Sequence, residues 1–423
     1  MADGINLIIT FEMIYQVTTD IKEIKGAINL PASKSISNRA LILNALSYSP
    51  YPIRNLSDSD DTKVLTAALF SNSNKFDIGH AGTAMRFLTA FLAKIVGEWE
   101  ITGSERMQQR PISILVDALN QLGAQIEYLG NEGCPPLKIL GSHLKGQTIE
   151  LDGSVSSQYI SALLLIAPTI ENGLTLKLKG NVTSRSYIKL TLELMAKFGI
   201  QYRWDDNEIF VPEQKYFALD FTCEADWSGA SYWYQIMALV DNGELLLENL
   251  LLDSLQGDAN IAAWFEQFGV TSTQKEEGVL LEKHKNRQPE KLVLDFIENP
   301  DVAQTMACLC VAKNIPFHFS GLKTLKIKET DRITALQNEL AKFGASIAEP
   351  EFGELAWDGK LDQEQQEENS IINTYHDHRM ALAFAPMALA GFSMRIDDPM
   401  VVTKSYPGFW EDLKQVGFSI EAD

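Results

Sequence analysis

Charged and hydroxyl side chains gather at several expected helix starts along the chain. Residues 31–46 carry Lys34, Ser35 and Arg39, and the spacing of four residues puts Ser35 and Arg39 on one helix face. A helix start presents unpaired N–H groups and a partial positive charge, which suit a phosphate or a carboxylate. An ordinary capped helix with a solvated lysine would use the same residues, so both interpretations stay open for this segment alone.

Three further segments combine small or hydroxyl residues with an apolar helix. Gly79 and Gly82 permit close approach of a ligand to the backbone, and Thr83 is the expected cap. Hydrogen-bonding side chains recur at two later helix starts: Ser156, Ser157 and Gln158, then Ser184 and Tyr187. Serines are common helix caps, so structure alone also explains each segment.

The remaining segments are richer in charge. Their acids and bases stand at the starts of apolar helices: Arg110; Lys328, Glu329, Asp331 and Arg332; His376, Asp377, His378 and Arg379; and Lys404. A capping box with an exposed ion pair explains residues 328–332 as well as a functional site does. Two histidines around an aspartate could chelate a metal, but no further Cys/His cluster completes a shell, so no metal site is predicted.

A repeat of about 70 residues positions these segments. In each copy a helical stretch ends in an apolar residue, which is followed by a glycine suited to the left-handed helix stop and then by a strand-like run. The glycines are Gly123, Gly199, Gly269, Gly344 and Gly417. The intervals run from 269 − 199 = 70 to 199 − 123 = 76 residues, and a degenerate sixth copy ends near Ser71. Six units divide into two halves of three, so we expect an α/β protein with its ligands between the halves.

Size and charge narrow the class of protein. A chain of 423 residues is long enough for two or three domains. The net charge of −20 argues against a nucleic-acid partner, which needs a broad basic face. If the ligands are anions, the cations must therefore be concentrated in one place.

The apolar segments and the cysteines indicate the cellular compartment of the protein. No stretch approaches the roughly 20 apolar residues of a membrane span, and the apolar run of residues 5–11 predicts a strand rather than a signal peptide. Met13 is an alternative initiator. Of four irregularly spaced cysteines, Cys308 and Cys310 are expected in the core, and this cysteine usage fits a reduced cytoplasm.

As a set and in order, the segments resemble the 5-enolpyruvylshikimate-3-phosphate synthases over the whole chain. The shared signatures are SKSISNRA, LSDSDDT, GHAGTAMR, RMQQRPI, GSVSSQ, SRSYI, DWSGASY, LQGD, PDVAQT, KETDR, YHDHRMA and TKSYPGFWEDL. The resemblance implies a two-domain enolpyruvyl transferase-like α/β fold with six βαβαββ units, three per domain. One lobe would comprise residues 1–32 and 224–423 and the other residues 33–223, with the active site in the cleft between them.

The resemblance also implies a reaction: transfer of the enolpyruvyl group of phosphoenolpyruvate to the 5-hydroxyl of shikimate 3-phosphate through a tetrahedral intermediate, with release of phosphate, on the route to chorismate and the aromatic amino acids. Asp301 would be the general base, and Glu329 with Lys34 would take part in proton transfer. Shikimate 3-phosphate would be bound by Lys34, Ser35, Arg39, Ser156, Ser157, Gln158, Ser184, Tyr187, Asp301 and Lys328. Phosphoenolpyruvate would be bound by Lys34, Gly82, Arg110, Gln158, Arg332, Arg379 and Lys404. No organic cofactor or metal is implied, and we expect a monomer whose partners are small anionic substrates.

Four features depart from the family pattern. His80 stands where many members have Asn and Phe87 where some have Pro, next to the phosphoenolpyruvate loop, which leaves the strength of inhibition by glyphosate open. Thr324 replaces an Asn that contacts the shikimate phosphate in some members. The segment from residue 61 to 80 is shorter than usual, which predicts that the first unit has lost strands.

Three other functions compete with this prediction. A sister transferase that acts on a UDP-sugar usually presents a Cys in the loop matched by RMQQRP, where this chain has none and Cys134 falls later. An RNA-end-processing enzyme on a similar repeat scaffold is disfavoured by the acidic balance. A non-catalytic anion-binding protein would keep its only activity when Asp301 or Lys34 is replaced.

Overall fold

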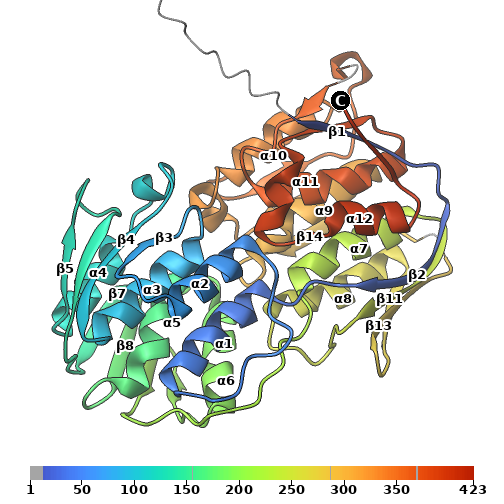
Figure 1. Cartoon of the computed structure of the whole chain (residues 1–423). Coiled ribbons are helices and arrows are strands. Elements are labelled where there is room, and N and C mark those ends of the chain that lie inside the picture. Colours follow the sequence, from blue (N-terminus) through green and yellow to red (C-terminus); the bar gives the residue numbers. More distant parts are fainter. Residues whose placement is uncertain (1–12, 155, 286, 368–369) are drawn as a thin grey trace, which may run out of the picture.

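The computed structural model describes residues 13–154, 156–285, 287–367 and 370–423. Its first element is β1 (Ile14–Thr18), and the strand expected over residues 5–11 lies outside the described residues. Figure 1 shows two bodies side by side, with the N-terminal strands in the body that also contains the C-terminus.

Buried apolar side chains form two separate clusters, one from residues 17–30 and 225–418 and one from residues 32–223. We call the first the discontinuous body and the second the continuous body. The reason for the discontinuity is strand pairing. β2 (Glu23–Asn29) runs parallel to β11 (Asn242–Glu248), and β1 lies between β18 (Met394–Asp397) and β19 (Ser419–Ala422). The N-terminal strands thus complete sheets built from the far end of the chain.

The chain passes between the clusters at two adjacent points. Ala32 and Ala225 form an isolated antiparallel bridge. The N–H of Ser33 donates to the carbonyl of Glu224 at 2.8 Å, and the N–H of Asp226 donates to that of Pro31 at 2.9 Å. The two crossing segments therefore hold each other in place.

The continuous body contains two sheets covered by helices. The sheets have the orders β3 (Lys75–Asp77), β4 (Gly97–Thr102), β6 (Leu137–Gly141), β5 (Gln125–Tyr128), and β7 (Thr148–Asp152), β8 (Leu174–Lys179), β10 (Glu208–Val211), β9 (Arg203–Asp205). The helices are α1 (Lys34–Leu46), α2 (Asp60–Phe70), α3 (Gly82–Lys94), α4 (Ser113–Gln121), α5 (Ser157–Ile166) and α6 (Arg185–Lys197). Residues 33–74, all described, contribute α1 and α2 but no sheet strand, as the short first unit predicts.

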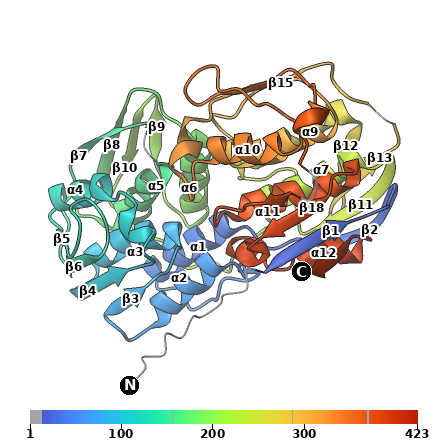
Figure 2. The same ribbon diagram turned by 90° about the horizontal axis from the view of Figure 1, so that it is seen from above.

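The described residues of the discontinuous body form three sheets. Besides the strands above, they are built from β12 (Val270–Gln274), β13 (Gly278–Lys283), β14 (Leu292–Asp295), β15 (Phe317–Ser320), β16 (Leu355–Trp357) and β17 (Ile371–Ile372). Its helices are α7 (Trp227–Leu239), α8 (Ile261–Phe265), α9 (Ala303–Ala312), α10 (Arg332–Ala341), α11 (His378–Phe384) and α12 (Phe409–Gln415). Cys308 and Cys310 are fully buried in α9, which confirms their core assignment. In Figure 2, α1 and α6 of one body and α10 and α11 of the other lie nearest the boundary.

The repeat glycines stop their helices as expected. All five have positive φ, from 80° at Gly269 to 105° at Gly417. Ser71, in the degenerate copy, is extended instead (φ −80°), because a residue with a Cβ avoids the left-handed region. The strand expected directly after Gly344 is wrong: only an isolated bridge between Ala348 and Ala356 forms there, and the strand proper is β16.

Candidate active site

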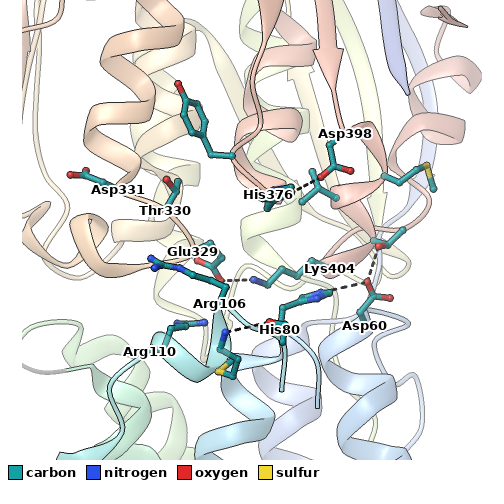
Figure 3. A pocket seen from close by; sticks show the side chains of 16 residues that line it. Asp60, His80, Arg106, Arg110, Glu329, Thr330, Asp331, His376, Asp398 and Lys404 are labelled. Carbon is teal, nitrogen blue, oxygen red and sulfur yellow. Dashed lines mark hydrogen bonds and ion pairs between the residues drawn. The ribbon is translucent and has the colours of Figure 1, made fainter. Parts of the chain in front are cut away.

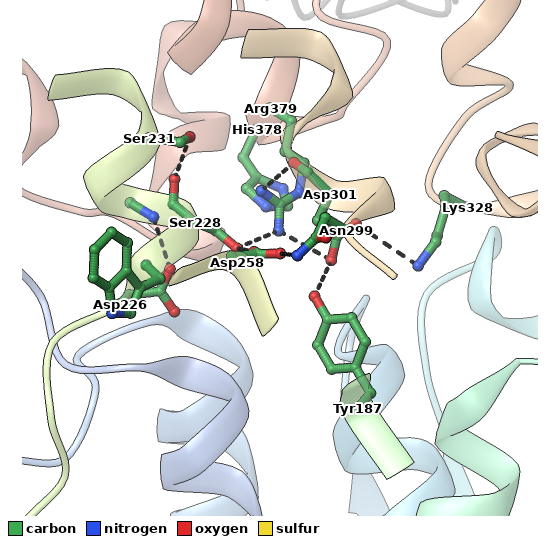
Figure 4. A network of polar contacts seen from close by, with 12 residues as sticks. Tyr187, Asp226, Ser228, Ser231, Asp258, Asn299, Asp301, Lys328, His378 and Arg379 are labelled. Atoms are coloured by element: carbon green, nitrogen blue, oxygen red, sulfur yellow. Dashed lines mark hydrogen bonds and ion pairs between the residues drawn. The ribbon is translucent and has the colours of Figure 1, made fainter. Parts of the chain in front are cut away.

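The carboxylate of Asp301 connects the two bodies. One oxygen accepts from the Tyr187 hydroxyl of α6 at 2.7 Å and lies 3.2 Å from Arg379. The other accepts from Arg332 at 3.0 Å and lies 3.7 Å from Lys328. Burial opposes ionisation of this carboxyl, but Arg379, Lys328 and Arg332 together hold its pKa well below the usual value. Asp301 is therefore an ionised carboxylate surrounded by cations (Figure 4).

Glu329 forms a second carboxylate centre beside the first. It accepts from Arg332 and from Lys404, each at 2.9 Å. Burial again works against the charge, and Lys404, Arg332 and, from the continuous body, Arg110 lower the pKa of Glu329 well below its usual value. The predicted catalytic carboxylates thus share the guanidinium of Arg332.

Asp377 is the site residue that sequence reasoning did not assign. Its fully buried carboxylate accepts from Arg332 at 2.6 and 3.2 Å and from the backbone N–H of Arg379 at 3.0 Å. Asp377 is also the N-cap of α11. An aspartate directly before an apolar helix was the available signal.

On the continuous side, Arg39 is buried among hydroxyl groups. It donates to Thr191 at 2.7 Å, to Ser161 at 3.1 Å and to the backbone carbonyl of Ser35 at 2.9 Å. The ring of Phe87, fully inside the core, lies 5.4 Å from the Arg39 guanidinium. Phe87 therefore supports Arg39 by a cation–π contact.

The caps differ in part from the predictions. Ser33, one of the two serines that could cap α1, does so, but α3 begins at Gly82 after Ala81, without a bond from Thr83. Thr83 instead accepts from the Gln158 amide at 3.4 Å. A Cβ on Gly82 would lie 2.9 Å from an Arg110 nitrogen, so a larger residue would displace the Arg110 guanidinium from the helix start.

The other predicted hydroxyl residues occupy helix starts. Ser156 caps α5, and Ser157 is the first residue of that helix. Ser184 adopts the left-handed conformation (φ 54°), and its N–H donates across the boundary to the carbonyl of Ile297 at 3.0 Å. Thr324 has a buried hydroxyl oxygen without a partner in the described part of the chain.

A cavity of about 800 Å³ lies between the bodies (Figure 3). Of the predicted residues, its wall includes Arg110, Glu329 and Lys404. Near its rim the Thr403 hydroxyl donates to Asp60 at 2.7 Å, and His80 lies 4.0 Å from Asp60. The other predicted residues are not among those that line it.

His378 indicates how closely the cations of both bodies converge. It is buried, and burial followed by the charges of Lys34, Arg379 and Lys404 lowers its pKa well below the usual value. Lys34 belongs to the continuous body and the other two to the discontinuous body. Among the described residues no group of three or more His, Cys, Asp or Glu side chains could hold a metal ion.

Two α/β bodies that bring ionised carboxylates and cations to a shared cavity define a two-lobed enzyme acting on small anions. The sequence matches the family model described as EPSP synthase (3-phosphoshikimate 1-carboxyvinyltransferase) over residues 18–71 and 68–413. A 3-phosphoshikimate 1-carboxyvinyltransferase of Bacteroides fragilis is 52% identical over 400 residues, which cover 94% of this chain and 97% of that protein. One of Vibrio atlanticus is 35% identical over 425 residues, covering 94% and 98%. The chain belongs to the EPSP synthase family.

The solved structures agree at the level of the fold. A structure of EPSP synthase from Acinetobacter baumannii has a TM-score of 0.79 at 20% identity, covering 97% of this chain and all of that one. The two-domain enolpyruvyl transferase fold predicted from the sequence is thereby confirmed. Among the described residues no helix is both long enough and apolar enough to span a bilayer.

Proposed function

We propose that this chain is a 3-phosphoshikimate 1-carboxyvinyltransferase, which moves the enolpyruvyl group of phosphoenolpyruvate to the 5-hydroxyl of shikimate 3-phosphate. Membership of the family along nearly the whole chain supports the reaction. The observation that carries the proposal is that cations of both bodies converge on Glu329 and His378. These cations are Lys34 and Arg110 from one body and Lys404 and Arg332 from the other.

The two substrates would occupy adjacent parts of the boundary. The phosphate and hydroxyls of shikimate 3-phosphate would bind the side on which Tyr187 meets Asp301, using the residues Lys34, Ser35, Arg39, Ser156, Ser157, Gln158, Ser184, Tyr187, Asp301 and Lys328. Phosphoenolpyruvate would bind beside the cavity, using Lys34, Gly82, Arg110, Gln158, Arg332, Arg379 and Lys404. Arginine forks suit its phosphate and carboxylate, at about 1.5–3 kcal/mol per charged hydrogen bond.

Asp301 would accept the proton of the 5-hydroxyl while the hydroxyl oxygen bonds to C2 of phosphoenolpyruvate. Glu329, assisted by Lys34, would deliver a proton to the methylene carbon, giving the tetrahedral intermediate. Elimination reverses these roles: a proton leaves the methyl group, the bond from C2 to the phosphate oxygen breaks, and phosphate departs. Both carboxyls are too acidic for this chemistry while paired with cations. Substrate anions that neutralise Arg332 and Lys404 would raise both pKa values toward neutrality, where acid–base catalysis is most effective.

The lobes proposed for this reaction are residues 1–32 with 224–423, and residues 33–223. The two separate cores and the paired crossing at Ala32 and Ala225 support these boundaries. We further propose that the enzyme acts as a monomer in the cytoplasm, needing no cofactor. Gel filtration tests the oligomeric state, and cell fractionation tests the compartment.

Phosphate release from phosphoenolpyruvate tests the proposed reaction. Release should require shikimate 3-phosphate and should not occur with a UDP-sugar in its place. Release with the UDP-sugar alone would assign the chain to the sister activity. Binding of both anions without any phosphate release would make it a non-catalytic binder.

A further inference from the structure

Glu339 is a buried carboxylate outside the residues assigned to substrates. It lies in α10, seven residues after Arg332, and its side chain has no exposed surface. Seven residues are about two helical turns, so Glu339 and Arg332 lie on one face of α10. Both contact residues 373–377, the segment that leads into α11.

Four hydrogen bonds satisfy the Glu339 carboxylate. One oxygen accepts from the backbone N–H of Asn373 at 3.0 Å and from Lys342 at 2.6 Å. The other accepts from the Tyr375 hydroxyl at 2.7 Å and from the Asn373 amide at 3.4 Å. A buried charge needs this many donors, and three of the four come from the segment before α11.

That segment has an unfavourable backbone conformation. Tyr375 and His376 both have φ of 54°, in the left-handed region that residues with a Cβ adopt only at a cost. The segment ends at Asp377, which binds Arg332 at 2.6 Å and the N–H of Arg379 at 3.0 Å. Helix α10 therefore holds the strained turn at both ends, through Glu339 on one side and Arg332 on the other.

We propose that Glu339 and Tyr375 are a positioning pair for Arg332 and Arg379, the guanidiniums assigned to phosphoenolpyruvate. This inference rests on the proposed function. Glu339 does not line the cavity and acts through the turn, and Tyr375, which does line the cavity, donates its hydroxyl to Glu339. Without its hydrogen bonds the two left-handed residues relax, Asp377 shifts, and both arginines lose the orientation that their substrate requires. A displacement of about 1 Å at such a site can cost up to ~10²-fold in rate.

Steady-state kinetics of Glu339→Gln and Tyr375→Phe test the inference. We expect kcat/KM for phosphoenolpyruvate to fall about tenfold or more in Glu339→Gln and a few-fold in Tyr375→Phe. KM for shikimate 3-phosphate should change less than about twofold, because of its assigned residues only Asp301 contacts the two arginines in the described part of the chain. The matched control is Tyr216→Phe, which removes a buried hydroxyl that donates to Leu165 at 2.8 Å in the other body. It should lower the thermal midpoint and leave both KM values unchanged.

Two results would overturn the inference. One is a lowered thermal midpoint with unchanged kinetics for phosphoenolpyruvate, and the other is an equal rise of both KM values. If Glu339→Gln does not fold, Tyr375→Phe decides, because it removes a single hydroxyl. Failure of the unaltered protein to release phosphate would count against the proposed function instead.

Discussion

At the scale of single residues, one guanidinium organises the site. Arg332 contacts Asp301 at 3.0 Å, Glu329 at 2.9 Å and Asp377 at 2.6 Å, and it is almost fully buried. Three carboxylates around one arginine leave excess negative charge, which Arg379, Lys328 and Lys404 compensate. Binding of substrate anions therefore has to exchange ion pairs within the site, and not simply fill an empty cationic pocket.

Replacing the expected base is the most direct test at this scale. Asp301→Asn keeps the shape and can still accept from Tyr187, but an amide does not take up a proton. We expect kcat for phosphate release to fall about 10²–10⁴-fold. Asp220→Asn, at an exposed carboxylate paired with Arg54, should have normal activity. Activity of Asp301→Asn within threefold of the unaltered protein would remove Asp301 from the mechanism.

A second carboxyl, Asp258, predicts a pH dependence of stability. It accepts from the Ser228 hydroxyl at 2.5 Å, and burial, followed by the charge of Asp301, raises its pKa from 3.8 to about 6. The folded state thus binds this proton more tightly than the unfolded state. The contribution of Asp258 is therefore most favourable below about pH 4 and is lost as pH rises through 6, by about 3 kcal/mol at ~1.36 kcal/mol per pH unit.

Urea unfolding at several pH values measures this effect. Asp258→Asn cannot titrate, so the free energy of unfolding of the unaltered protein minus that of the variant should fall by about 1–3 kcal/mol between pH 4.5 and 7.5. A difference that is flat or rises with pH over this range would refute the assignment.

At the scale of elements, the repeat places its helix stops at glycines that differ in their surroundings. Gly344, after α10, has φ of 83°, and a Cβ there would meet the carbonyl oxygen of Asp362 at 2.2 Å. Gly391, which ends the 3₁₀ segment Ala385–Ala390 and is not a repeat glycine, has a similar φ of 85° but open space around it. Alanine substitutions at the two positions therefore distinguish the cost of a left-handed backbone from the cost of a steric collision of the new Cβ.

We expect Gly391→Ala to lower the free energy of unfolding by about 1–2 kcal/mol, the cost of a left-handed residue with a Cβ. Gly344→Ala should cost at least about 1 kcal/mol more, because the backbone of residue 362 must also move. Denaturation of both variants under identical conditions gives the comparison. Equal losses would show that the Asp362 segment yields without cost.

At the scale of the whole molecule, hydrogen bonds between described residues cross the boundary between the bodies. They include Tyr187 to Asp301, Thr403 to Asp60 and the backbone of Ser186 to Glu298, at 2.6–2.7 Å. Lys34 and Arg110 face the cations of the other body across this boundary, so bound anions should draw the bodies together by neutralising the repulsion.

Small-angle scattering tests this closure. The radius of gyration should decrease when shikimate 3-phosphate and phosphoenolpyruvate are both present. The decrease should be smaller for Arg110→Ala, because one cation is missing. An unchanged radius of gyration with both ligands bound, shown by concurrent calorimetry, would argue for a rigid site. Closure would also exclude water from the intermediate.

The sequence alone determined the features that depend on local patterns. Glycine spacing predicted the repeat and its left-handed stops, the short segment before His80 predicted the reduced first unit, and ordered motifs indicated the family. These are short-range properties, because helix periodicity and backbone preference belong to neighbouring residues. Even there, Thr83 was wrong as a cap, since the exact cap depends on where the helix packs.

Only the tertiary structure decided which charges meet. Asp377 pairs with Arg332 across 45 positions of sequence, and Glu339 reaches Tyr375 across 36. Such pairs depend on how α10 packs beside the segment before α11, which no local pattern specifies. The same reason explains why the sequence could name Asp301 but could not show that Tyr187 of the other body already occupies one of its oxygens.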